Sequence, residues 1–368
     1  MKKALALVLA LGMIFSLCAC GGSSAPAAAP AAAAAPAEAA APAEAAAPAE
    51  AAAPAEEAAP AATREETLVL RVGTNHGSAT AVVKALNYAA ELLEERTGGG
   101  VKLEIYSDGV LGDETSLRDQ VAQGSLDMAA LGAGVFGAYT NAANLPVSNF
   151  VWESREEMME VLNGELGKKY INDPVEEASN IHVLYGWPQA ARQLMTKEPV
   201  AKLGDIKDMK IRVPAGNTLY VDTWNYYGSL ATSMSMNDCY TALETGVIDG
   251  LEMPIDSLYS AGYYEVCKYL TLSSHMMYLQ YVMINADSFA KLSAEEQEIL
   301  ENVIIDAEKF HTETLDASVQ EMVDDMVNNH GVTVIELEDQ QAWMDATAVI
   351  NEQWMDNWGQ EVYDAFCG

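Results

Sequence analysis

The longest stretch without a helix-breaking residue constrains this fold most. No proline or glycine occurs between Ser293 and Gly331, and the stretch opens with Ser293-Ala-Glu-Glu296, a pattern typical of a helix capping box. A helix of about 36 residues rising about 1.5 Å per residue would be about 54 Å long, whereas a small domain is about 30 Å across. The economical interpretation is one helix that spans two lobes and ties them together.

The length of the folded part also favours two lobes. Residues 66–368 number about 300, which is more than one hydrophobic core usually organises. Strand-like and helix-like segments alternate along them, which predicts α/β units with mostly parallel sheets. Strands are predicted at 67–72, 101–106, 126–131, 180–185, 192–196, 210–213, 247–251 and 278–285, helices at about 78–96, 113–123, 154–166, 218–227, 237–245 and 293–330, and a final helical stretch in which Trp343, Trp354 and Trp358 are packing anchors.

The N-terminus has the pattern of an exported lipoprotein. Two lysines precede the apolar run Ala4 to Ala19, which is shorter than the roughly 20 residues of a membrane-spanning helix. The run ends in Leu17-Cys18-Ala19-Cys20, which resembles the lipobox of bacterial lipoproteins. We expect a signal peptide over 1–19 and a lipid on Cys20. Cys18 is the alternative acceptor, and an ordinary signal peptide is the alternative interpretation.

Residues 20–65 consist almost entirely of alanine, proline and glutamate, with the unit Ala-Pro-Ala-Glu-Ala-Ala recurring. Such a composition buries no core, and proline blocks a continuous helix. We expect a disordered tether. At about 3.1 Å per residue in extended stretches, it would hold the folded part on the order of 100 Å from the outer face of the membrane.

Charge and motif content exclude several functions. The chain carries 54 acidic and 20 basic residues, a formal net charge of −34, so it lacks the basic surface that nucleic-acid binding needs. No nucleophile elbow, zinc motif, paired-cysteine motif or phosphate loop occurs, so we expect neither enzyme activity nor a cofactor nor a metal site. The pattern Gly132-Ala-Gly134-Val-Phe-Gly137 matches a dinucleotide-binding signature but follows a third strand and precedes no clear helix, so a tight turn at the cleft is expected. Three cysteines of the folded part show no disulfide or metal pattern and are expected to be small buried residues: Cys239, Cys267 and Cys367.

Two arginines lie among apolar strand residues. Arg212 stands in Lys210-Ile-Arg-Val-Pro214, and Arg192 precedes Gln-Leu-Met. A buried guanidinium needs a partner, and its planar fork matches a carboxylate in bidentate geometry. From the residues alone, a structural ion pair and a carboxylate ligand are both open.

The chain resembles TRAP-type (tripartite ATP-independent periplasmic) solute-binding proteins over about residues 67–330. Several motifs carry the resemblance together, in matching order and spacing. They are the segment 203–214 (Leu-Gly-Asp-Ile-Lys-Asp-Met-Lys-Ile-Arg-Val-Pro), the segment 240–250 (Tyr-Thr-Ala-Leu-Glu-Thr-Gly-Val-Ile-Asp-Gly), Tyr264-Glu-Val-Cys-Lys-Tyr269, Leu111-Gly-Asp-Glu114 and Gly124-Ser-Leu-Asp127.

This resemblance implies a two-lobed, type II-like periplasmic-binding fold whose lobes are joined by crossing strands and the long helix. We expect lobe 1 at 66–189 plus about 279–318 and lobe 2 at 190–278 plus about 319–368. The implied function is capture of an organic acid between closing lobes and its delivery to the TRAP membrane permease. The membrane would be contacted only through the lipid anchor.

The resemblance also implies which residues bind the ligand. Arg212 matches the arginine that pairs with the ligand carboxylate, and Arg192 matches a second arginine position. Met253 stands where many members carry a polar contact, and Gly132 and Val135 stand where sialic-acid binders carry charges, which disfavours sialic acid. A roomier pocket with two methionines suggests an acid with an apolar or aromatic body, while a four-carbon dicarboxylate is open but less favoured. The candidate ligand-binding residues are Arg212, Arg192, Asn75, Met253, Met236, His275, Glu114 and Gln189.

Three alternative functions remain. A binding protein of an ABC importer would share the lobes, although the motif set argues against it. A binding protein that serves a sensor would use the same fold. A secreted lipoprotein hydrolase is the alternative from a different class.

Overall fold

The computed structural model describes residue 64 and residues 66–367, which all belong to one compact unit. The predicted signal peptide, the lipid acceptor Cys20 and nearly all of the predicted tether lie outside the described residues. Within the described part, no helix combines the length and the apolar character needed to cross a bilayer.

The first sheet has five strands in the order β2-β1-β3-β10-β4. Helix α1 packs on it through residues spaced three or four apart, from Val82 to Leu93, all of them fully buried. Thr80 begins this helix by accepting a hydrogen bond from the amide of Val83. The bounds are β1 Leu68–Gly73, β2 Val101–Tyr106, β3 Met128–Gly132, β4 Ile181–Pro188, β10 Leu279–Asn285, α1 Ala81–Arg96 and α2 Glu114–Ala122.

The second sheet has six strands in the order β11-β9-β5-β8-β6-β7. Its core includes Met195, Leu251 and Leu270 of three different strands, all fully buried together with Leu258 of α8. The bounds are β5 Arg192–Thr196, β6 Lys210–Pro214, β7 Leu230–Met234, β8 Gly250–Pro254, β9 Tyr269–Met276, β11 Thr333–Glu336, α6 Thr218–Tyr226, α7 Cys239–Glu244 and α8 Ile255–Ser260.

Both sheets are mostly parallel, as predicted, but each contains one strand that runs against the others. β10 runs antiparallel to β3 and β4, and β5 runs antiparallel to β8 and β9. These two strands follow directly from the other sheet, through Gln189–Ala191 into β5 and through Met277–Tyr278 into β10. A strand that enters from the opposite sheet runs away from the space between the sheets, whereas strands that follow a helix run toward it.

A few predicted boundaries are wrong. The strand predicted at 247–251 is β8, Gly250–Pro254. Gly246 ends α7 with a positive φ of 77°, and the amides of Val247 and Ile248 then hydrogen-bond back to the carbonyl of Ala242, which keeps both residues out of the strand. In the glycine pattern 132–137, Gly132 ends β3 and the rest lies in a 3-10 helix, Ala133–Ala138, which agrees with the expected tight turn.

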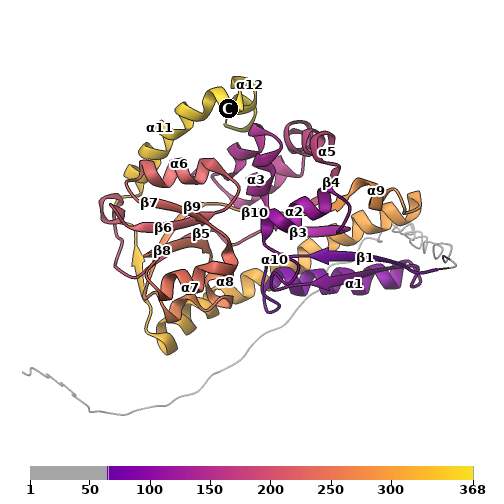
Figure 1. The fold of residues 1–368 in the computed structure, drawn as a ribbon, viewed down its shortest axis with the longest axis horizontal. Helices are drawn as coiled ribbons and strands as arrows, with labels where there is room; N and C mark the ends of the chain where they lie inside the picture. The colour runs from indigo at the N-terminus through magenta and orange to yellow at the C-terminus, as the bar shows by residue number, and fades with distance from the viewer. Residues whose placement is uncertain (1–63, 65, 368) are drawn as a thin grey trace, which may run out of the picture. The chain divides into compact units, whose positions relative to one another are not determined.

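The long helix α10 runs from Ala294 to His330 and confirms the principal prediction. Ser293 and Glu296 form its capping box, and Gly331 ends it with a left-handed conformation. Its first half packs on α1 and β4 of the first sheet and its second half on α8 of the second sheet (Figure 1). Leu300 and Met326 are accordingly buried in different core clusters.

The C-terminal helices pack against elements near both sheets. Trp343 is fully buried on α11 and makes edge-to-face contacts with Trp224 and Tyr227, 6.0 and 5.0 Å between ring centroids. Trp354 and Trp358 are also buried, as packing anchors should be, whereas Cys367 is exposed, unlike Cys239 and Cys267. The remaining helices are α3 Arg155–Leu162, α4 Glu165–Gly167, α5 Asp173–Ser179, α9 Ala286–Phe289, α11 Gln340–Trp358 and α12 Gln360–Cys367.

Candidate ligand-binding site

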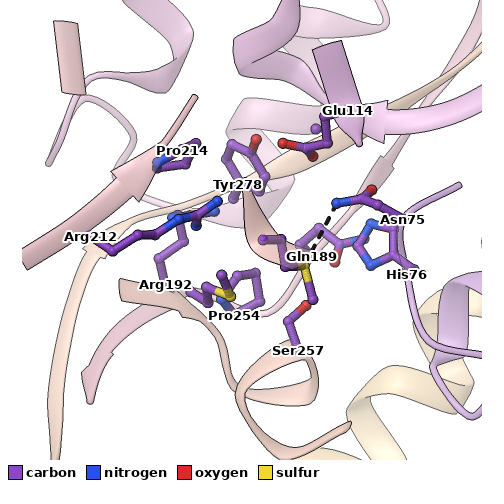
Figure 2. Close-up of a pocket in the computed structure, with 13 residues that line it drawn as sticks. Asn75, His76, Glu114, Gln189, Arg192, Arg212, Pro214, Pro254, Ser257 and Tyr278 are labelled. Carbon is purple, nitrogen blue, oxygen red and sulfur yellow. Dashed lines mark hydrogen bonds between the residues drawn. The ribbon is translucent and has the colours of Figure 1, made fainter. Parts of the chain in front are cut away.

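A cavity with ≈ 410 Å³ of empty volume lies between the two sheets (Figure 2). The first sheet contributes the loop after β1, the start of α2 and the end of β3, and the second contributes β6, β8 and the start of α8. The two segments that cross between the sheets supply Gln189 and Tyr278, and the amide of Gln189 donates to the carbonyl of Tyr278 at 2.8 Å. The lining residues are Asn75, His76, Glu114, Gly132, Gln189, Arg192, Arg212, Pro214, Met236, Met253, Pro254, Ser257 and Tyr278.

Arg212 is the unpaired cation of this cavity. It lies on β6, between β7 and β8, and is 2% exposed. Its Nε donates to the carbonyl of Met234 at 2.9 Å, and no carboxylate of the described residues lies within salt-bridge distance of it. A buried guanidinium with its terminal nitrogens toward a cavity is suited to a bidentate hydrogen bond from an anionic ligand.

Arg192 is bound to the protein instead. Its Nε and a terminal nitrogen donate to Glu252 at 2.5 and 2.8 Å, and its guanidinium lies over the ring of Tyr278, 4.7 Å from the centroid. Burial alone would raise the pKa of Glu252, but the charge of Arg192 and hydrogen bonds from His275 and Arg192 lower it to about 2. The Arg192–Glu252 pair therefore stays ionised and adds little net charge to the cavity.

His275 supports this pair from behind the cavity. It is fully buried, its Nε2 lies 3.2 Å from Glu252 Oε2, and its Nδ1 lies 2.8 Å from Ser273 Oγ. Burial lowers the pKa of His275, more than the hydrogen bond to Glu252 raises it. A neutral imidazole that accepts from Ser273 can donate to Glu252, which fixes the carboxylate against Arg192.

Glu114 extends from the start of α2 into the cavity (Figure 2). Burial raises the pKa of Glu114, although the positive charges of Arg212 and Arg192 oppose the shift. The site thus holds one unpaired cation and one carboxyl group whose pKa is raised by burial. Such a carboxyl can accept from a ligand hydroxyl when ionised or donate to a ligand oxygen when protonated.

Several other polar groups of the cavity lack partners among the described residues. Asn75 donates only to the sulfur of Met236, at 3.6 Å, and its Oδ1 is unpaired (Figure 2). Both amide atoms of Gln189 and Nδ1 of His76 are also unpaired. Burial lowers the pKa of His76 to about 4, so this imidazole is neutral at pH 7. Buried polar groups usually find partners, so these atoms are available to a polar ligand or to water.

Seven of the eight predicted residues line the cavity: Arg212, Arg192, Asn75, Met253, Met236, Glu114 and Gln189. His275 lies behind it, as described above. Sequence reasoning missed His76, Pro214, Pro254, Ser257 and Tyr278. All five lie within four residues of a predicted one, which is a usable signal, and Tyr278 reaches the site because its segment crosses between the sheets.

The described residues contain no group of three or more histidine, cysteine, aspartate or glutamate side chains placed to hold a metal ion.

The glycine pattern 132–137 has a packing role. A Cβ on Gly132 would lie 2.0 Å from the hydroxyl oxygen of Tyr278, and one on Gly134 would lie 2.5 Å from that of Tyr220. These glycines let two tyrosines approach the backbone beside the cavity.

Comparison with known proteins gives a consistent result. Residues 72–357 match the sequence model of bacterial extracellular solute-binding protein family 7. A solute-binding protein from Chromohalobacter salexigens is 31% identical over 277 residues, which cover 74% of this chain and 80% of the relative. The 2,3-diketo-L-gulonate-binding periplasmic protein of Escherichia coli is 30% identical over 260 residues, covering 70% and 77%.

Solved structures with bound acids are similar as well. A TRAP periplasmic solute-binding protein from Chromohalobacter salexigens with bound D-glucuronate superposes with a TM-score of 0.76 at 29% identity, covering 81% of this chain and 97% of that one. A second, from Roseobacter denitrificans with bound L-galactonate, gives 0.76 at 26% identity, covering 83% and 100%.

Proposed function

This chain belongs to bacterial extracellular solute-binding protein family 7, and from that premise we propose that its cavity captures a hydroxylated organic acid whose carboxylate pairs with Arg212. The protein is the extracytoplasmic binding component of a TRAP transporter and not an enzyme. The observation that carries the proposal is the buried, unpaired guanidinium of Arg212 in the cavity.

A hydroxylated body fits the cavity better than the apolar body that Met236 and Met253 suggest. Asn75, Gln189 and His76 offer unpaired donors and acceptors, and Glu114 offers a carboxyl group. An apolar ligand would leave these groups buried without partners, at a cost of about 1–3 kcal/mol each. The acids bound by the two similar structures, glucuronate and galactonate, carry several hydroxyl groups.

Capture would proceed by closure of the two lobes on the acid. The ligand carboxylate would meet Arg212, and its hydroxyls would meet Glu114, Asn75 and Gln189. Closure excludes water, which strengthens the ion pair because the local dielectric constant falls. The crossing segments at Gln189 and Tyr278 join the lobes and are natural hinge positions. The membrane permease would then recognise the closed form.

The lipid anchor remains part of the proposal. Cys20 would be acylated after removal of residues 1–19, and the tether would hold the binding protein outside the cytoplasmic membrane. Mass spectrometry of the membrane-extracted protein tests this step. A mature protein that begins at Cys20 and carries the added mass of acyl chains supports the lipid anchor. A soluble protein with an unmodified N-terminus contradicts it.

The test of function is a thermal-shift screen of the mature chain, from Cys20 onward, against uronic, aldonic and simple carboxylic acids. A ligand at 100 times its Kd should stabilise the protein by about 2.7 kcal/mol. Arg212→Ala should lose the shift, while Lys84→Ala, which removes one exposed positive charge from α1, should retain it. An equal response of Arg212→Ala and wild type would contradict the carboxylate assignment.

A further inference from the structure

A second cavity adjoins the first one. It has ≈ 570 Å³ of empty volume and shares Asn75 and Met236 with the inner cavity, so the two are neighbours across these side chains. We call it the rim cavity. The residues that define it here are Gly77 and Asp108 next to the first sheet, and Asn237, Tyr240, Ser260 and Tyr263 next to the second.

The residues next to the first sheet and those next to the second sheet approach each other closely at the rim cavity. A Cβ on Gly77 would lie 3.7 Å from Cβ of Ser260, and one on Gly109 would lie 3.0 Å from Oδ1 of Asn237. Asp108 has a positive φ of 59° and is held by hydrogen bonds from the amide of Ser78, at 3.1 Å, and the hydroxyl of Ser107, at 2.5 Å. The Asp108 carboxylate is therefore held in place at the edge of the rim cavity and is still exposed.

The chemistry of the rim cavity differs from that of the inner one. Two tyrosines supply aromatic surface, while Asn237, Ser260 and Asp108 supply donors and acceptors for hydroxyl groups. None of the residues lining it is cationic, and Glu265, which accepts from the hydroxyl of Tyr240 at 2.5 Å, adds a second negative charge nearby. A hydroxylated neutral group suits this surface, whereas a carboxylate would be repelled by Asp108.

We propose that the rim cavity is a second ligand subsite, which takes a neutral hydroxylated unit linked to the acid held at Arg212. The preferred ligand class is then a singly charged, two-unit acid, such as a uronic or aldonic acid joined to a neutral sugar. This inference rests on the proposed function, because the acid unit must first occupy the inner cavity. Arg212 would fix one end of the ligand, and Asn75 and Met236, which line both cavities, would lie beside the link to the other end.

Calorimetric titration of the mature chain tests the subsite with two matched pairs of acids. The pairs are gluconate with lactobionate, and glucuronate with an aldobiouronic acid in which it is linked to neutral xylose. For at least one pair, the extended acid should bind about tenfold more tightly than the simple one, the equivalent of one or two net hydrogen bonds. Digalacturonate, whose second unit is charged, should bind more weakly than the aldobiouronic acid.

Two variants of rim-cavity residues, Tyr240→Ala and Asp108→Asn, test whether the rim cavity causes the preference for extended acids. For each variant, the measured quantity is the ratio of the Kd of the simple acid to the Kd of the extended acid. Tyr240→Ala should bring the ratio toward one, whereas Tyr226→Ala, at a 46% exposed tyrosine on α6 outside both cavities, should leave it as in wild type. Asp108→Asn should narrow the difference between digalacturonate and the aldobiouronic acid.

The outcomes separate the two proposals. If simple acids bind in an Arg212-dependent manner but extended acids bind no better, the rim subsite is wrong and the proposed function stands. A preference for extended acids that survives Tyr240→Ala also contradicts the subsite. If no acid of either kind binds, the carboxylate function itself is wrong, and the rim inference falls with it.

Discussion

The guanidinium of Arg192 and the carboxylate of Glu252 are in direct contact on neighbouring strands of the second sheet, with Nε 2.5 Å from Oε2 and both side chains almost fully buried. This contact satisfies one of the two arginines beside the cavity and leaves Arg212 without a carboxylate partner among the described residues. From the residues alone the two arginines looked equivalent, yet Arg192 is paired with a carboxylate of the protein and Arg212 is not.

Breaking this pair should be costly. Glu252→Gln leaves the Arg192 charge buried without a counterion, and we expect a loss of about 3–5 kcal/mol in the free energy of unfolding. Urea denaturation at pH 7 measures it. Arg192→Met combined with Glu252→Gln should recover part of the loss, because no unpaired charge remains. A single variant as stable as wild type would contradict the pairing.

Glu114 should couple ligand binding to proton uptake. An anionic ligand placed near Glu114 should raise the pKa of this carboxyl further than burial already does. The bound state then holds more protons, so acid affinity should increase as pH falls through the raised pKa of Glu114. Calorimetry in buffers of different ionisation enthalpy measures the uptake above pH 5, where the ligand stays ionised. Glu114→Gln should abolish it, and an unchanged uptake in that variant would rule Glu114 out as the source.

Asp256 should make stability depend on pH. It is fully buried at the start of α8, its oxygens lack partners among the described residues, and burial raises its pKa from 3.8 to about 6. The folded state binds its proton more tightly than the unfolded state, so this group lowers stability as pH rises from 3.8 to about 6. The difference in the free energy of unfolding between Asp256→Asn and wild type should therefore change in favour of the variant by on the order of 1 kcal/mol as the pH is raised from 5 to 7.5. Denaturation at both pH values measures this, and the exposed Asp356→Asn on α11 should show no such gain.

Gly132 should tolerate no side chain. Its backbone conformation, φ −58° and ψ 141°, suits alanine, but the added Cβ would lie 2.0 Å from the Tyr278 hydroxyl. We expect Gly132→Ala to cost about 1–3 kcal/mol in the free energy of unfolding and to weaken acid binding, because Tyr278 must shift beside the cavity. Gly204→Ala, where no atom lies within 4 Å of the added carbon, should stay within about 0.5 kcal/mol of wild type. Equal stability of the two variants would contradict the packing argument.

Local sequence patterns determined much of this protein. The segment between Ser293 and Gly331 determined α10, because caps and the absence of breakers act within a few residues. Its length alone then required two packing partners. Motifs in several strands placed seven of the eight candidate residues at one cavity. These residues stand at or near the ends of strands and helices, and such ends meet at one edge of an α/β sheet.

Only the tertiary structure decided strand direction, the roles of the two arginines, and the place of Tyr278. Direction depends on which sheet a strand enters from, and the crossing segments 189–191 and 277–278 carry no local signal of that. Arg192 and Glu252 lie on different strands and are 60 residues apart along the chain, yet they are in contact in the folded protein. Among 54 acidic residues, sequence offers no means to choose this partner, because an ion pair is set by distance in space and not by spacing along the chain.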